Sequence, residues 1–122
     1  MLVLKPVSDK NLIKEYYEKE NIPFSDNANL LLATDREEVL GYCLFDISKT
    51  LTVHIVKPLD DIFLLDGVLR STLHVGCERG ITDAFYSSTA PEDKFNTLNF
   101  IKSQEEKRLD VDKLFASCCG CK

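Results

Sequence analysis

The sequence lacks an excess of basic residues and a long apolar run. Its 15 Lys and Arg residues are outnumbered by 20 Asp and Glu residues, which gives a formal net charge of −5. Binding to nucleic acid or to an anionic membrane surface needs a basic face, so we expect neither partner. No segment approaches the roughly 20 apolar residues that span a bilayer. The N-terminal MLVLKPVSDK also has too short an apolar run for a signal peptide, and we expect a cytoplasmic protein.

The chain also lacks a second pair of metal ligands beside its cysteine-rich end. Cys118 and Cys121 have the spacing of a zinc knuckle, but such sites draw two further ligands from elsewhere. We therefore predict no metal site. Structural zinc, redox chemistry and a reactive tail remain alternatives for these two residues and Cys119. Cys43 and Cys77 stand alone in apolar surroundings and are expected to pack as small hydrophobes.

The remaining composition is that of an ordinary globular protein. The 122 residues are 44% hydrophobic and 29% charged, and they contain no internal repeat or linker. This length is enough for one core, so residues 1–122 are predicted to form a single domain.

The first half of the chain alternates between strand and helix patterns. Residues 2–4 predict a short strand, and residues 8–20 predict a helix whose first residues offer N-cap oxygens. Residues 30–47 form two β-rich runs around four polar residues, which indicates an antiparallel hairpin. A third run, TLTVHIV, is predicted to place Leu51, Val53 and Ile55 on one face and Thr52, His54 and Val56 on the other.

A long helix is predicted after Pro58. Asp60 and Asp61 are good capping residues, and their negative charge suits the positive end of the helix dipole. The helix ends near Gly80, which fits the left-handed C-cap position. Apolar residues at helical spacing then mark its buried side, namely Ile62, Leu65, Leu69 and Leu73.

The remainder of the chain predicts shorter elements. Residues 84–86 are expected to be a strand, followed by a helix with Pro91 in its first turn and Thr89 as its cap. Phe95, Leu98 and Ile101 form the predicted buried side of that helix. A short strand is expected over residues 104–109, and a last helix is expected to begin at Asp110 or Asp112. A strand–helix–strand unit behind a hairpin predicts an α/β (α+β) fold, with a mixed, mostly antiparallel sheet and helices on both faces.

Five short marks in this order resemble the GNAT superfamily of N-acetyltransferases over nearly the whole chain. The first strand ends in a Lys-Pro pair, the third is entered through a V-x-G-like run, and the fourth closes on V-x-P. The long helix ends on a small residue and a glycine, and an L-G-F-like run stands near the end. The matching residues are Leu4-Lys5-Pro6, Val39-Leu40-Gly41-Tyr42, Val56-Lys57-Pro58, Gly76 with Gly80-Ile81-Thr82, and Leu98-Asn99-Phe100.

The resemblance implies an acyltransferase that moves an acetyl group from acetyl-CoA to a small-molecule or peptide amine. In that family the sheet splays between the fourth and fifth strands, and the pantetheine arm bonds to the fourth-strand backbone, here His54, Ile55 and Val56. The diphosphate binds at the start of the next helix. The corresponding residues here are Phe63, Leu64, Leu65, Asp66 and Gly67. A homodimer that completes the edge of the sheet stays open.

Two features depart from the family pattern. The loop at residues 59–67 carries Asp60 and Asp61 where the family has a basic or amide residue, and it has no glycine before Gly67. Phe95 stands where many members have a tyrosine that protonates the departing thiolate. The alternative function is therefore a binding or regulatory module that keeps the fold but lacks a competent loop for the CoA diphosphate and has lost catalysis.

His54 is the candidate catalytic residue. It is the residue on the fourth strand with an unperturbed pKa suited to a general base at neutral pH. The alternative for this histidine is a packed, hydrogen-bonded strand residue. Asp46, at the end of the hairpin, has two alternatives as well: recognition of an amine, or an ordinary exposed acid at a strand end.

Overall fold

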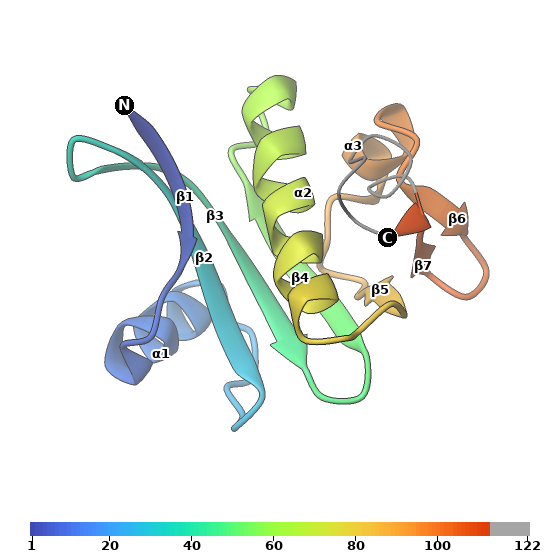
Figure 1. Ribbon diagram of the computed structural model, residues 1–122, viewed down its shortest axis with the longest axis horizontal. Helices are drawn as coiled ribbons and strands as arrows, with labels where there is room; N and C mark the ends of the chain where they lie inside the picture. Colours follow the sequence, from blue (N-terminus) through green and yellow to red (C-terminus); the bar gives the residue numbers. More distant parts are fainter. Residues whose placement is uncertain (113–122) are drawn as a thin grey trace.

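The computed structural model describes residues 1–112 and confirms the mixed sheet with helices on both faces (Figure 1). The elements in chain order are β1 (Leu2–Pro6), α1 (Lys10–Lys19), β2 (Ala28–Asp35), β3 (Glu38–Ile47), β4 (Leu51–Lys57), α2 (Ile62–Glu78), β5 (Ala84–Tyr86), α3 (Glu92–Thr97), β6 (Ile101–Ser103) and β7 (Arg108–Leu109). The strand order is β1-β2-β3-β4-β5-β7-β6, and within this sheet only β4 and β5 pair in parallel.

Residues 113–122 lie outside the described part of the chain. The main part of the predicted last helix and the three cysteines Cys118, Cys119 and Cys121 lie outside the described residues. Across residues 1–112, none of the helices has both the length and the apolar content needed to cross a membrane.

Capping residues at α1 and α2 and the polar turn of the hairpin lie where the sequence predicts them. The Asp9 carboxylate accepts hydrogen bonds from the backbone at the start of α1, and the Asp61 carboxylate does the same for α2. Gly80, just past α2, has a φ of 78°, the left-handed conformation that glycine adopts without strain. Arg36 and Glu37 have φ values of 51° and 74° and form the tight turn between β2 and β3.

Alternating side chains of the sheet divide the core in two. Leu31 and Ala33 of β2 join the larger cluster under α2, whereas Leu30 of the same strand joins the cluster under α1. On the α2 side the helix lies close to the sheet at Gly76, where a Cβ atom would lie 2.8 Å from Leu51 Cδ1.

The alternation predicted for β4 is wrong beyond Val53. Leu44 of β3 pairs with Ile55 and Phe45 pairs with Val53, so His54 is an extra residue in β4. Such a bulge reverses the side-chain alternation beyond it. Val56 therefore joins Val53 in the core beneath α2, while Ile55 packs against the cluster beneath α1.

The region after β5 also differs from the prediction. Thr89 does not cap α3; its hydroxyl donates instead to the carbonyl of His54, and Pro91 occupies the N-cap position without a side-chain bond. Ile101 belongs to β6 rather than to the buried side of α3. The single strand predicted over residues 104–109 is a turn followed by β7, because the chain reverses there to pair β7 with β6.

The sheet splits between β4 and β5, as the resemblance implies. Only Leu51, Thr52 and Val53 have partners in β5, and the Ser87 amide donates to the Val53 carbonyl at 2.9 Å where the pairing ends. From His54 onward, β4 is paired with β3 alone among the described strands. On its other side, β4 and β5 separate (Figure 1).

Candidate active site at the splayed strands

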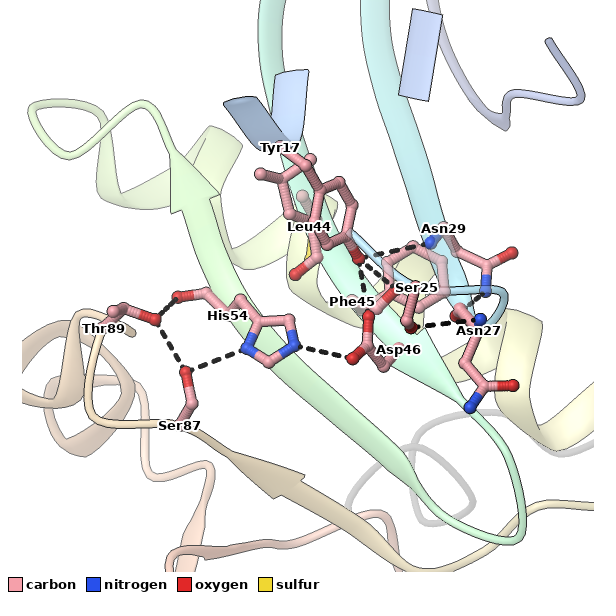
Figure 2. Close-up of polar contacts among 11 residues, drawn as sticks. Tyr17, Ser25, Asn27, Asn29, Leu44, Phe45, Asp46, His54, Ser87 and Thr89 are labelled. Atoms are coloured by element: carbon pink, nitrogen blue, oxygen red, sulfur yellow. Dashed lines mark hydrogen bonds and ion pairs between the residues drawn. The ribbon is translucent and has the colours of Figure 1, made fainter. Parts of the chain in front are cut away.

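His54 lies at the point where the two strands separate, between an acid and a hydroxyl (Figure 2). Its Nδ1 is 3.1 Å from Ser87 Oγ, directly after β5, and its Nε2 is 3.1 Å from Asp46 Oδ2 on β3. The histidine side chain is only 16% exposed and the aspartate side chain 31% exposed. Three separate segments of the sheet thus place three polar side chains in one chain of contacts.

The Asp46 carboxylate decides which ring nitrogen carries the proton. An ionised carboxylate can only accept, so the neutral ring of His54 keeps its proton on Nε2. Nδ1 then presents a lone pair to the Ser87 hydroxyl. Nε2 and the Asp46 carboxylate are in close polar contact rather than joined by an aligned hydrogen bond, because the distance is short but Nε2 has no hydrogen-bond partner of good geometry.

Tyr17 of α1 holds Asp46 in place. Its hydroxyl lies 2.9 Å from Asp46 Oδ1 and 2.8 Å from the Phe45 carbonyl, and it accepts from the Asn29 amide at 3.2 Å. Burial raises the pKa of the Asp46 carboxyl, but the close contact with His54 and the hydrogen bond from Tyr17 outweigh burial and lower that pKa from 3.8. Burial and the nearby Asp46 charge raise the pKa of the Tyr17 phenol, so it stays protonated as a donor.

Thr89 links the loop after β5 to the same site. Its Oγ1 donates to the His54 carbonyl at 2.9 Å and lies 2.7 Å from Ser87 Oγ (Figure 2). The loop therefore contacts both the ring and the backbone of His54. That carbonyl belongs to the β4 segment expected to bond the pantetheine arm.

The start of α2 does not fit a diphosphate. The Asp61 carboxylate accepts from the Leu64 amide at 3.1 Å, so it occupies one of the N–H groups that a phosphate needs. A carboxylate within about 5 Å of a phosphate oxygen costs on the order of several kcal/mol at an effective dielectric near 20. Phe63 is 86% exposed beside it, whereas Leu65 is completely buried in the core.

An apolar groove adjoins this helix start. It has a volume of about 380 Å³ and is lined by Leu2, Leu4, Leu40, Asp61, Phe63, Leu64 and Gly67. The Asp66 carboxylate, also expected near the diphosphate, instead pairs with Arg70 at 3.0 Å one turn along α2. Asp61 is thus the charged residue in the lining of this groove, and its charge has the wrong sign for an anion.

The sequence predicted His54 as a site residue, which stays a prediction, but did not predict its hydroxyl partners. Ser87 and Thr89 follow a three-residue strand, and nothing in their spacing points to a histidine more than 30 residues earlier. For Asp46, the structure shows an acid bonded to His54 and Tyr17 rather than an unpartnered acid at a strand end. No local signal in the sequence could have joined these residues.

The other singled-out residues pack in the core. Cys43 is fully buried, which raises the pKa of its thiol to about 12 and confirms its packing as a small hydrophobe. Cys77 is half-buried against the same core. Phe95 is also fully buried and makes an edge-to-face contact with Tyr86. Across residues 1–112, no three His, Cys, Asp or Glu residues come together as a group that could hold a metal ion.

Solved structures of acetyltransferases have a fold similar to that of this chain. A GNAT-family protein from Desulfovibrio desulfuricans matches 85% of this chain over 87% of its own, with a TM-score of 0.58 and 13% identity. The ribosomal-protein-S18-alanine N-acetyltransferase from Escherichia coli matches 88% of each chain, with a TM-score of 0.57 and 11% identity. An acetyltransferase candidate from Exiguobacterium sp. 255-15 matches 96% over 97% of its own chain, with a TM-score of 0.60 and 12% identity.

These likenesses confirm the resemblance to the GNAT superfamily at the level of the fold. No family model matches the sequence, and no curated protein matches it.

Proposed function

We propose that this protein is an N-acyltransferase that moves an acetyl group from acetyl-CoA to a small-molecule or peptide amine. One observation carries the proposal: a β4 bulge places His54 at the split of a GNAT-like sheet, with Asp46 on one ring nitrogen and Ser87 on the other. The proposal keeps the cytoplasmic location expected from the sequence, and it includes neither nucleic acid nor membrane as a partner.

The chemistry assigned to this chain is removal of a proton from the amine. An amine attacks a thioester only after it loses a proton, and a positioned base at neutral pH promotes that step. Asp46 fixes the His54 ring and stabilises the charge that forms when Nδ1 takes up a proton. The acetyl-CoA itself supplies a thioester activated for transfer.

The residues that would hold acetyl-CoA are those of the β4 backbone from His54 to Val56, whereas the start of α2 from Phe63 to Gly67, the expected diphosphate site, does not fit that group. The β4 residues lie where β4 has separated from β5. At the start of α2, the Asp61 carboxylate would repel the diphosphate. We therefore expect weak binding that depends on the pantetheine arm.

Calorimetry with acetyl-CoA and with CoA tests the binding. Binding at micromolar to millimolar ligand supports the proposal, and its absence at millimolar ligand rejects it. For catalysis, His54→Gln should lower acetylation of a panel of amines on the order of 10²-fold. His74→Gln, an exposed histidine on α2, is the matched control and should leave the rate unchanged.

A second candidate is a catalytically degenerate module that keeps the fold and binds another macromolecule. The specific observation in its favour is Phe63, an aromatic side chain 86% exposed at the helix start where the diphosphate would lie. Exposed large aromatics are enriched where proteins meet partners. Unchanged melting of the protein in millimolar acetyl-CoA would favour this candidate.

A further inference from the structure

We propose that Ser87 is a nucleophile that takes up an acyl group, so that Ser87, His54 and Asp46 act as a serine–histidine–acid triad. The substrates are small activated esters and thioesters, and acyl uptake does not need the CoA diphosphate. The activity therefore goes beyond the proposed amine acetylation and stands or falls separately from it.

The distances meet the requirements for an activated serine. A nucleophile needs a base within about 2.6–3.2 Å, and that base needs a third group to orient it. Ser87 Oγ lies 3.1 Å from His54 Nδ1, and Asp46 Oδ2 lies 3.1 Å from the other ring nitrogen. The order of the two nitrogens is the reverse of that in chymotrypsin, but triads are defined by geometry and roles.

The backbone holds Ser87 independently of its hydroxyl. Its amide donates to the Val53 carbonyl at 2.9 Å, the last rung before the strands separate. The ring of His54 is fixed from the other side through Asp46, whose second oxygen is bonded to Tyr17. Nucleophile and base are thus both attached to the sheet, which favours a defined attack geometry.

The surroundings leave Ser87 accessible from solvent. The residue is half-buried, and the two residues that follow it are exposed. Figure 2 shows its side chain between the His54 ring and Thr89, on the loop that leaves β5. Thr89 Oγ1 lies 2.7 Å from Ser87 Oγ, and because its own proton goes to the His54 carbonyl, it can only accept there and competes with His54 Nδ1 for the Ser87 proton.

The acyl-uptake step balances with the groups present. Ser87 Oγ attacks the acyl carbon, its proton moves to His54 Nδ1, and the resulting imidazolium is paired with Asp46. The bond from the acyl carbon to the leaving alkoxide or thiolate breaks, and the leaving group takes the proton from Nδ1. Water or an amine then attacks the acyl-serine, gives a proton to Nδ1, and this proton returns to Ser87 Oγ as the product leaves.

Covalent labelling with a fluorophosphonate probe tests the proposal on the full chain. Mass spectrometry should find the probe on Ser87, and Ser87→Ala should reduce labelling to background. His54→Gln and Asp46→Asn should slow labelling on the order of 10²-fold, because the hydroxyl loses its oriented base. Ser88→Ala, the neighbouring exposed serine, is the matched control and should label like the unmodified protein.

Hydrolysis of p-nitrophenyl acetate provides the second readout, after the thiols are blocked with iodoacetamide. Equal labelling or equal hydrolysis in a Ser87→Ala variant with an unchanged melting temperature would overturn the triad. So would labelling at another residue, or no labelling of the folded protein. Amine acetylation from acetyl-CoA without labelling of Ser87 overturns the triad but keeps the proposed function, whereas labelling of Ser87 without acetyl-CoA binding gives the opposite result.

Discussion

At the scale of single residues, the ionised Asp46 carboxylate determines which ring nitrogen of His54 carries the proton. Asp46 is the acceptor that keeps the ring proton on Nε2, and Tyr17 keeps the acid in place from the opposite oxygen. Neither partner is next to Asp46 in the sequence, so the sheet pairing of β3 with β4 and the packing of α1 create this environment. The stabilisation that Asp46 gains from these contacts should therefore appear in the pH dependence of the free energy of unfolding.

Asp46→Asn should remove a stabilisation that is present at neutral pH and lost in acid. The pKa of Asp46 is lowered from 3.8 in the folded state, so its contribution is complete above the unfolded value and declines as pH falls through the folded one. Urea unfolding from about pH 7 to about pH 3 should show the difference between the two proteins shrinking in acid. Asp60→Asn, at an exposed carboxylate, is the control variant. A difference for Asp46→Asn that stays the same from neutral to acidic pH would contradict this account.

At the scale of elements, the sequence predicted the helix ends and the hairpin turn that neighbouring residues determine. Asp61 and Gly80 define the two ends of α2 through their own capping geometry, and the polar turn between β2 and β3 marks the hairpin. The bulge at His54 was missed, because a pattern of period two cannot show one inserted residue. The contact of Ser87 with His54 spans 33 residues and exists only through the pairing of β5 with β4.

Two glycines of α2 should respond in opposite ways to alanine. Among residues 1–112, an added Cβ at Gly67 would meet Leu4 Cδ1 at 3.9 Å, which is ordinary contact, so Gly67→Ala should stabilise the protein by about 0.5–1 kcal/mol through helix propensity. At Gly76 the added Cβ would lie 2.8 Å from Leu51 Cδ1, and Leu51 is buried. Gly76→Ala should therefore destabilise by about 1–3 kcal/mol.

Urea unfolding of both variants under the same conditions checks this pair. Each serves as the control for the other, because the substitution and the helix are the same and only the contact with the sheet differs. Stabilisation by Gly76→Ala would show that α2 can move away from β4 at little cost.

At the scale of the whole molecule, the split between β4 and β5 is where the fold and the chemistry meet. The parallel pairing stops after Val53, and the loop from Ser87 to Pro91 crosses to the β4 backbone through Thr89. The separation of β4 from β5 thus leaves a gap between the two strands. The Thr89 hydroxyl bonds to the first β4 carbonyl beyond the parallel pairing, that of His54. A ligand that donates to the His54 carbonyl competes with that hydroxyl.

Thr89→Val should therefore strengthen the binding of acetyl-CoA, if the pantetheine arm bonds to the His54 carbonyl. Valine keeps the shape of threonine but cannot donate, so the ligand no longer competes with a hydrogen bond of 2.9 Å. A single hydrogen bond contributes about 0.5–1.5 kcal/mol net, which corresponds to an affinity gain of roughly two- to tenfold. Calorimetric titration of both proteins measures it.

Thr97→Val is the matched control for this titration. It removes a threonine hydroxyl that also donates to a backbone carbonyl at 2.9 Å, but within α3 and away from the split. An equal change of affinity in both variants would mean that the effect comes from general loosening of the region. A loss of affinity in Thr89→Val alone would mean that the threonine holds the ligand rather than competing with it, and that the loop after β5 forms part of the binding site.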